Sequence, residues 1–132
     1  MKSVRDTVAP GRKTILLVED ERDMLRVLEK FLSARGYKIL AAYDGEKAIE
    51  VFCRHKTEID AVFLDVGLPK THGFDVLTKI KNENPGVRVV VTSGYLDQPI
   101  QRKMYDAGIR DFVAKPYQLP DVAKTIERLL TR

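Results

Sequence analysis

The sequence predicts one open, doubly wound α/β domain, in which a parallel sheet is covered by helices on both faces. First, short apolar runs without polar interruption are typical of strands that are buried on both faces. Second, helical periodicity follows each run, so consecutive strands are about ten or more residues apart, and connections of that length join parallel strands. Third, a length of 132 residues suits one domain with a substantial core.

Predicted strands and helices alternate along the whole chain. The strands cover Thr14–Val18, Tyr37–Ala42, Asp60–Asp65, Val87–Ser93 and Arg110–Ala114. The helices cover Glu21–Arg35, Glu46–His55, Phe74 to about Asn84, Asp97–Ala107 and Leu119–Leu130. Residues 1–12 are polar, lack periodicity and contain Pro10-Gly11, so we expect a flexible lead there and the folded domain at 13–132.

The first strand is apolar after its threonine and ends on Glu19-Asp20. In the helix that follows, apolar residues recur at helical spacing and predict one buried face, and Gly36 is the expected helix stop. This predicted face consists of Met24, Val27, Leu28, Phe31 and Leu32. The second strand is less apolar than the others, which indicates a position nearer an edge of the sheet.

Asp44-Gly45 predicts a turn, with Asp44 as the N-cap of the second helix. The apolar residues of that helix are Ala48, Ile49, Val51 and Phe52. Cys53 lies in the same helical pattern and is interpreted as a packing or surface residue rather than a catalytic one. As the single cysteine it also excludes an internal disulfide framework.

The third strand contains four apolar residues in a row and ends on Asp65, and a loop marked by Pro69 and Gly73 follows at once. Asp65 is therefore expected at the carboxyl end of a central strand, where open α/β sheets bind their ligands. The helix after the loop is marked by Phe74, Val76, Leu77 and Ile80, and it ends near Asn84-Pro85-Gly86.

The fourth strand is rich in β-branched residues and is closed by Gly94. A short, weakly patterned helix then ends at Gly108, and the fifth strand is closed by Lys115-Pro116. The last helix has its predicted inner side at Leu119, Val122, Ile126, Leu129 and Leu130.

Composition excludes several classes of protein. The net charge of +4 and the pI of about 9.2 permit contact with nucleic acid, but lysine and arginine are spread over every predicted helix without a basic run, so we expect no direct nucleic-acid binding. No apolar stretch approaches the length of a membrane span and no signal-peptide pattern opens the chain, so we expect no membrane insertion and a cytoplasmic protein.

Charged and hydroxyl side chains follow several of the predicted strands. Because the carboxyl ends of parallel strands share one edge of the sheet, we expect these side chains to gather there: Glu19, Asp20, Asp65, Thr92, Ser93 and Lys115. Carboxylates this close repel one another unless a cation lies between them, and a few hard oxygen ligands suit Mg²⁺. No cysteine or paired histidine accompanies them, which argues against a soft metal. A carboxylate with a divalent ion, an ammonium and a hydroxyl around it suits attack on a phosphoryl group, with an aspartyl-phosphate as the product.

Each of these residues has an ordinary structural explanation when it is taken alone. Glu19 and Asp20 suit the first turn of the following helix, Ser93 simply ends a strand, and Lys115 is a solvated charge. Their joint occurrence at successive strand ends is harder to attribute to chance.

Four segments in order resemble the receiver domain of two-component response regulators, of the chemotaxis-regulator type. They are Ile15–Glu21, Leu64–Pro69 continued to Gly73, Thr92-Ser93-Gly94 and Ala114-Lys115-Pro116. The resemblance runs from about Thr14 to the end of the chain. It implies a flavodoxin-like three-layer fold with strand order 2-1-3-4-5. It also implies a phosphorelay signalling domain rather than an enzyme, with at most self-phosphorylation from small phosphodonors and slow autodephosphorylation.

The resemblance assigns roles to the acidic residues. Asp65 resembles the phosphoacceptor, which takes its phosphoryl group from a sensor histidine kinase or a histidine phosphotransfer protein. Asp20 resembles the direct Mg²⁺ ligand, with Mn²⁺ as an alternative ion, and Glu19 resembles the acidic neighbour that acts largely through water. Asp65 and the backbone carbonyl of Gly67 complete the expected protein ligands. Glu19 stands where the family more commonly has aspartate, which lengthens its reach.

The resemblance also assigns a switch. Lys115 resembles the lysine that pairs with the phosphoacceptor and then with the phosphoryl oxygens, and its bond to Pro116 is expected to be cis. Ser93 is preferred to Thr92 as the switch hydroxyl, because the family has a small residue directly after it and because the spacing of 22 residues to Lys115 fits better. Phe112 resembles the aromatic residue whose rotamer follows the hydroxyl, although simple packing on an edge strand also explains it.

Gly67 and Tyr95 occupy the two positions that influence phosphoryl lifetime in this family. The expected output is a change in the surface around 97–107 and 112–130, read by a downstream protein or an attached effector, with the domain a monomer or a phosphorylation-dependent homodimer. His55 and His72 are interpreted as surface residues, although His72 follows Asp65 closely enough to affect the docking of a partner.

Three other functions are compatible with the same pattern. A Mg²⁺-dependent phosphatase also forms an aspartyl-phosphate, but such enzymes usually carry a second aspartate at the place of Gly67. A protein-interaction module that is never phosphorylated would not need the acidic pair and Lys115. A flavin-binding module is the weakest alternative, because the loops lack a phosphate-cradling sequence and the chain has no tryptophan.

Overall fold

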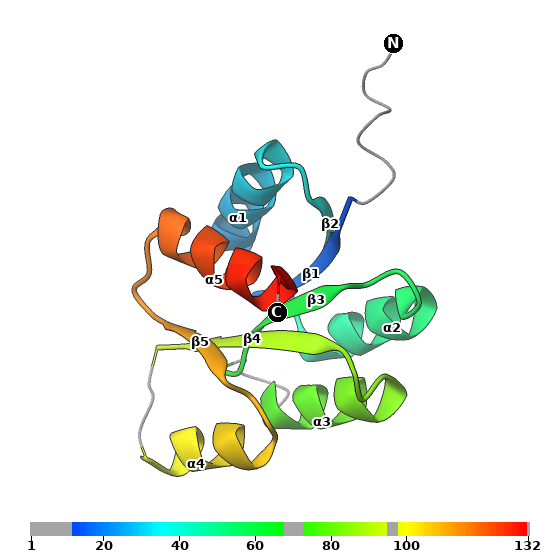
Figure 1. Ribbon diagram of the computed structural model, residues 1–132, viewed down its shortest axis with the longest axis vertical. Helices are drawn as coiled ribbons and strands as arrows, with labels where there is room; N and C mark the ends of the chain where they lie inside the picture. The colour runs from blue at the N-terminus through cyan, green and yellow to red at the C-terminus, as the bar shows by residue number, and fades with distance from the viewer. Residues whose placement is uncertain (1–11, 68–72, 95–97, 132) are drawn as a thin grey trace.

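The sheet is parallel, and its strands lie in the order β2-β1-β3-β4-β5 with a helix after each strand (Figure 1). A computed structural model of the chain describes residues 12–67, 73–94 and 98–131. The strands are β1 (Thr14–Val18), β2 (Lys38–Ala42), β3 (Ala61–Asp65), β4 (Arg88–Ser93) and β5 (Asp111–Ala114). The helices are α1 (Arg22–Ala34), α2 (Gly45–His55), α3 (Gly73–Glu83), α4 (Gln98–Asp106) and α5 (Leu119–Thr131). The predicted doubly wound, flavodoxin-like fold and its strand order are confirmed.

Each predicted element is present, and no end differs from its prediction by more than one residue. The predicted local signals account for this agreement. Gly36 and Gly108 have φ angles of +98° and +78°, a region that glycine enters without strain, and they end α1 and α4. The Asp44 carboxylate accepts a hydrogen bond of 2.7 Å from the backbone N–H of Lys47, which makes Asp44 the N-cap of α2 as predicted.

Two apolar cores lie on opposite faces of the sheet, because successive side chains of each strand point to opposite faces. Helices α2, α3 and α4 cover one face, and α1 and α5 cover the other (Figure 1). The first core includes Leu16, Val18, Val62, Leu64, Val89 and Val91 from the strands and Phe52, Ile80 and Met104 from the helices. The second includes Ile15, Leu17, Phe63, Val90 and Val113 with Leu28, Leu32, Val122 and Ile126.

The burial of the strands follows their place in the sheet. Every residue of β1 and β3 is buried, and in β4 only Arg88 is exposed. Strands β2 and β5 lie at the edges and are partly exposed, as the lower apolar content of β2 predicted. The central strand β3 therefore brings Asp65 to the middle of the carboxyl edge.

One predicted helix face is wrong in part. In α1 the side chain of Val27 is 45% exposed, whereas Leu25, which the predicted face omitted, is buried with Leu28 and Leu32. Met24 and Phe31 of the predicted face pack against the margin of the core, so the buried side of α1 is centred on Leu25, Leu28 and Leu32. In α5 the predicted Leu119 and Leu130 pack against the core while partly buried, and Ala123 and Thr125, which the prediction omitted, are buried as well.

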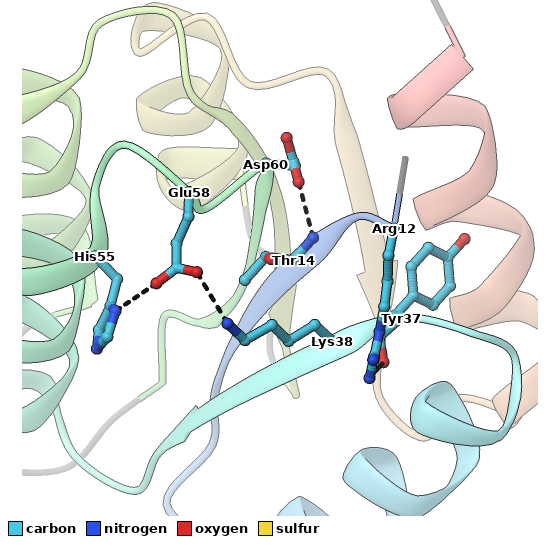
Figure 2. A network of polar contacts seen from close by, with 7 residues as sticks. All are labelled: Arg12, Thr14, Tyr37, Lys38, His55, Glu58 and Asp60. Carbon is cyan, nitrogen blue, oxygen red and sulfur yellow. Dashed lines mark hydrogen bonds and ion pairs between the residues drawn. The ribbon is translucent and has the colours of Figure 1, made fainter. Parts of the chain in front are cut away.

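The amino edge of the sheet is held by polar contacts that involve the starts of three strands (Figure 2). Glu58 lies between two side chains, with Lys38 Nζ at 2.9 Å and His55 Nδ1 at 2.5 Å from its carboxylate oxygens. The Asp60 carboxylate accepts a hydrogen bond of 2.8 Å from the backbone N–H of Thr14. These contacts give His55 a structural role at the end of the sheet opposite to Asp65.

The proposed domain start at residue 13 stays a prediction, because residues 1–11 lie outside the described ranges. Within those ranges no helix is long and apolar enough to cross a lipid bilayer. His72 and Tyr95 also lie outside the described residues.

The start of α3 packs directly against the segment that follows Asp65. A Cβ atom placed on Gly73 would lie 2.2 Å from Cα and 2.6 Å from the carbonyl oxygen of Val66, which is too close for any side chain. Only glycine therefore allows α3 to pack this closely on the residue next to Asp65.

Replacement of Gly73 by alanine is expected to lower the free energy of unfolding by about 1–3 kcal/mol, because the backbone on both sides must move apart. Gly86→Ala is the matched control, since a Cβ there meets only the Asn84 side chain at 3.7 Å. Its effect should stay within about 0.5 kcal/mol. Urea unfolding of both variants measures the difference, and equal stability of the two would contradict the close packing at Gly73.

Candidate functional site at the carboxyl edge of the sheet

Carboxylates from two neighbouring strands converge at the carboxyl edge. Glu19 and Asp20 follow β1 directly, and Asp65 is the last residue of β3, which pairs with β1. One ligand oxygen from each of the three lies within 4.8 Å of those of the other two. Glu19 is fully buried and Asp65 is 3% exposed, whereas Asp20 is exposed. Such crowding of anions is unfavourable without a cation.

Lys115 supplies that cation. Its Nζ donates a hydrogen bond of 2.7 Å to Asp65 Oδ2 and lies 3.2 Å from Glu19 Oε1. The backbone positions it, since the N–H of Lys115 donates to the Ser93 carbonyl at 3.0 Å and the bond to Pro116 is cis, as expected. Lys115 and Asp65 therefore meet as the resemblance implied, although 50 residues separate them.

The ionisation of this cluster reflects burial and mutual charge. Burial raises the pKa of Glu19, and the charge of Asp65 adds to the rise, while the N–H of Glu21 and the charge of Lys115 oppose it. For Lys115, burial acts to lower the pKa, but the hydrogen bond and charge of Asp65 and the charge of Glu19 outweigh burial and raise it. Lys115 is therefore a permanent cation at neutral pH.

The two candidate hydroxyls differ in position. Thr92 pairs with Asp65 in the sheet and is fully buried, and its Oγ1 has no hydrogen-bond partner among the described residues. Ser93 is 4% exposed and borders the space beside Gly67. A Cβ atom on Gly67 would lie 3.2 Å from Asp65 Oδ1 and 4.0 Å from Ser93 Oγ, so both oxygen atoms border that space. The N–H of Gly67 donates to Asp65 Oδ1 at 2.8 Å.

The donor set fits a hard divalent cation. The three carboxylates offer only oxygen ligands, which Mg²⁺ prefers, and the group lies within the reach of a single ion. The buried Oε1 of Glu19 is ion-paired with Lys115 Nζ at 3.2 Å but does not meet hydrogen-bond geometry with any described residue, so it can accept a further partner. Native proteins seldom leave a buried carboxylate oxygen in this state without a ligand or water.

Residues 15–127 match the family of response regulator receiver domains. The chain belongs to this family. As a receiver domain it is a signalling domain of two-component response regulators, a family that binds Mg²⁺ at an acidic pocket and interacts with histidine kinases and downstream effectors.

Three relatives illustrate the similarity. A cyclic di-GMP phosphodiesterase from Thermotoga maritima is 36% identical over 106 residues, which covers 80% of this chain and 28% of that protein. The sensor kinase CckA from Brucella abortus is 29% identical over 131 residues, which covers 99% of this chain and 14% of the kinase. A crystal structure of the CheX–CheY–BeF₃–Mg²⁺ complex from Borrelia burgdorferi has a TM-score of 0.85 at 25% identity, over 98% of this chain and 96% of that one. The receiver domain spans less than a third of either of the first two proteins.

Phe112 of the receiver domain lies on the edge strand β5, next to Val91 in the register with β4, and is 48% exposed. The aromatic ring is therefore close to the strand that carries Ser93, but on the outside of the fold. Whether its rotamer follows the hydroxyl stays a prediction, as do the roles expected for Gly67 and Tyr95.

Sequence reasoning missed Tyr117. It contacts the ring of Phe63 edge-on, with centroids 5.9 Å apart, and lines a cavity of about 410 Å³ together with Glu19 and Lys115. Burial, followed by the charge of Glu19, raises its pKa to about 12. The only signal in the sequence was its position two residues after Lys115, which does not reveal where the hydroxyl points.

Replacement of Lys115 by methionine is expected to destabilise the receiver domain without divalent ions, because Glu19 and Asp65 lose the cation between them. The expected loss in the free energy of unfolding is about 1–3 kcal/mol. It is smaller than the loss on breaking a fully buried ion pair, because Lys115 is partly exposed. Added Mg²⁺ should recover part of it.

The matched control is Lys56→Met. Lys56 Nζ lies 2.9 Å from Glu83 Oε1, nearly the same distance as in the Lys115 pair, but both partners are exposed. Its loss should be smaller than that of Lys115→Met, because solvent screens an exposed ion pair. Urea unfolding in EDTA measures both variants, and equal losses would contradict the assigned role of Lys115.

Proposed function

We propose that the receiver domain accepts a phosphoryl group on Asp65 from a sensor histidine kinase or a histidine phosphotransfer protein. The observation that carries this proposal is the contact of 2.7 Å between Lys115 Nζ and Asp65 Oδ2, beside the carboxylates of Glu19 and Asp20. This arrangement combines a nucleophile, a cation for the incoming phosphoryl oxygens and ligands for a divalent ion.

Asp20, Asp65 and the carbonyl of Gly67 would hold the Mg²⁺ ion, or Mn²⁺ with the same oxygen ligands, and Glu19 would bind through water. When bound, the ion neutralises the negative charge of the phosphoryl oxygens. The residues support this assignment by their chemistry, since Asp20 is open to solvent and Glu19 keeps a buried oxygen for a further partner.

In the proposed transfer, an Oδ atom of Asp65 attacks the phosphorus atom and forms the new O–P bond. The P–N bond to the donor histidine breaks, and its electron pair stays on the imidazole nitrogen. Lys115 then moves its hydrogen bond from the Asp65 carboxylate to a phosphoryl oxygen. Because Lys115 is held by β5 and remains charged, it follows the negative charge without a change in protonation.

The proposed switch begins with Ser93. The phosphoryl group carries a charge of about −1.5 to −2 at neutral pH and attracts donors, so the Ser93 hydroxyl moves toward it. Ser93 is preferred to Thr92 because its Oγ borders the space beside Gly67 and Asp65 Oδ1. The movement of Ser93 would make room for Phe112 and shift a two-state equilibrium of the surface formed by α4, β5 and α5.

A downstream protein or an attached effector would read this surface, with the domain as a monomer or as a phosphorylation-dependent homodimer. The proposal includes no direct contact with nucleic acid and no insertion into a membrane. Turnover of small phosphodonors and slow autodephosphorylation are the only catalytic activities proposed.

Acetyl phosphate with Mg²⁺ should place one phosphoryl group on the wild-type chain and none on Asp65→Asn, because the amide is not a nucleophile. Intact-protein mass spectrometry measures the incorporation. Asp44→Asn is the control, since asparagine caps a helix as well as aspartate and Asp44 is not one of the three clustered carboxylates. It should be phosphorylated normally, and one phosphoryl group on Asp65→Asn would refute the assignment of the nucleophile. A wild-type chain that takes no phosphate would favour the non-phosphorylated interaction module.

Gly67 is proposed to tune the phosphoryl lifetime together with Tyr95. The missing side chain leaves space beside Asp65 Oδ1 for an attacking water molecule. Gly67→Ala is therefore expected to slow the decay of the phosphorylated domain several-fold after the phosphodonor is removed, whereas Gly86→Ala should leave the decay unchanged. An equal or faster decay in Gly67→Ala would contradict water access past Gly67.

A further inference from the structure

Among the described residues, the buried side-chain atoms without a hydrogen-bond partner are Glu19 Oε1, Thr92 Oγ1 and the hydroxyl of Tyr117. All belong to residues at the carboxyl edge of the sheet or in the loop after β5. Folded proteins leave few buried polar atoms without a hydrogen bond. The presence of three such atoms near one site therefore has a local cause.

The hydroxyl of Tyr117 is not needed to fill space. The ring of Tyr117 packs edge-on against Phe63, at an interplanar angle of 87°, and against the core on the α1–α5 side of the sheet. Phenylalanine would make the same contacts and would not place a hydroxyl where its desolvation is unfavourable. A buried donor in this position therefore requires an acceptor.

Glu19 offers that acceptor in the same cavity. Tyr117 and Glu19 both line the cavity of about 410 Å³, whereas Thr92 does not. The charges that act on the pKa of Tyr117 are those of Glu19, Lys115, Asp65 and Glu21, and the charge of Glu19 has the largest effect of these. The hydroxyl of Tyr117 is a potential donor, and Glu19 Oε1, whose only polar contact among the described residues is the ion pair with Lys115 Nζ at 3.2 Å, is a potential acceptor. At about 410 Å³ the cavity has room for ordered water.

We propose that Tyr117 is a positioning residue for the metal site, and that its hydroxyl donates a hydrogen bond to an ordered water molecule that in turn donates to Glu19 Oε1. The inference rests on the proposed function. The other oxygen of the carboxylate, Oε2, accepts from the N–H of Glu21 at 3.1 Å, so the water would fix the second oxygen as well. The water would hold Glu19 Oε1 in place even after Lys115 has moved its hydrogen bond to the phosphoryl group.

An outer contact of this kind controls the affinity for the ion, because it holds the ligand in the orientation that binding needs. Tyr117→Phe removes the hydroxyl and keeps the ring. Its dissociation constant for Mg²⁺, measured by isothermal titration calorimetry, should rise about tenfold. The Mg²⁺ concentration for half-maximal phosphorylation by acetyl phosphate should rise by the same factor.

A double-mutant cycle with Glu19→Gln tests the route of the effect. In the Glu19→Gln background, Tyr117→Phe should change the dissociation constant for Mg²⁺ less than about twofold, because the acceptor is already altered. Tyr37→Phe is the matched control and should bind Mg²⁺ like the wild type. Tyr37 packs against the same core and burial raises its pKa too, but it lies at the amino edge of the sheet (Figure 2).

The outcomes separate the inference from the proposed function. If Asp65 is phosphorylated and Tyr117→Phe binds Mg²⁺ with wild-type affinity, the positioning role is wrong and the function stands. If the wild-type chain binds no Mg²⁺ and takes no phosphate, both are wrong. A high-resolution crystal structure of the wild type gives an independent test that does not depend on whether a variant folds. A water molecule must lie within hydrogen-bond distance of both Tyr117 Oη and Glu19 Oε1. The absence of that water molecule would overturn the inference.

Discussion

The ion pair between Lys115 and Asp65 is the contact on which the arrangement of the site depends. Two strands end with carboxylates at one edge of the sheet, and two of those carboxylates are buried. Without a cation their repulsion and desolvation would oppose the pairing of β1 with β3 at this edge. Lys115 meets both buried carboxylates, and the edge strand β5 holds it there through the backbone bond to Ser93.

The two edges of the sheet use charge in different ways. At the amino edge, Glu58 is paired with both Lys38 and His55, which leaves its charge balanced by side chains of the fold itself (Figure 2). At the carboxyl edge, Glu19 retains an oxygen atom without a hydrogen bond, and Asp20 is open to solvent. The charge at the amino edge is therefore balanced within the fold, whereas the carboxyl edge keeps oxygen ligands open for the ion and the phosphoryl group of the proposed function.

The same sheet links the site with the proposed output surface over a short distance. Ser93 is the last residue of β4 and pairs with Ala114 of β5, while Phe112 pairs with Val91 two residues earlier. In the proposed switch, a shift of Ser93 would act on the neighbouring strand directly, and this strand is an edge strand with a half-exposed aromatic ring. An edge strand can adjust at lower cost than the buried β3, since it has neighbours on one side only.

The sequence alone determined the fold class, the ends of the elements to within one residue and the set of charged groups at the carboxyl edge. These features depend on local patterns, namely apolar runs, helix caps, glycine stops and the rule that parallel strands end together. The tertiary structure decided that Leu25 rather than Val27 faces the sheet, that Ser93 and Gly67 border the same space, and that the hydroxyl of Tyr117 is buried beside Glu19. Periodicity cannot separate such cases, because the choice depends on which neighbours from distant segments fill the space, and those neighbours exist only after the chain has folded.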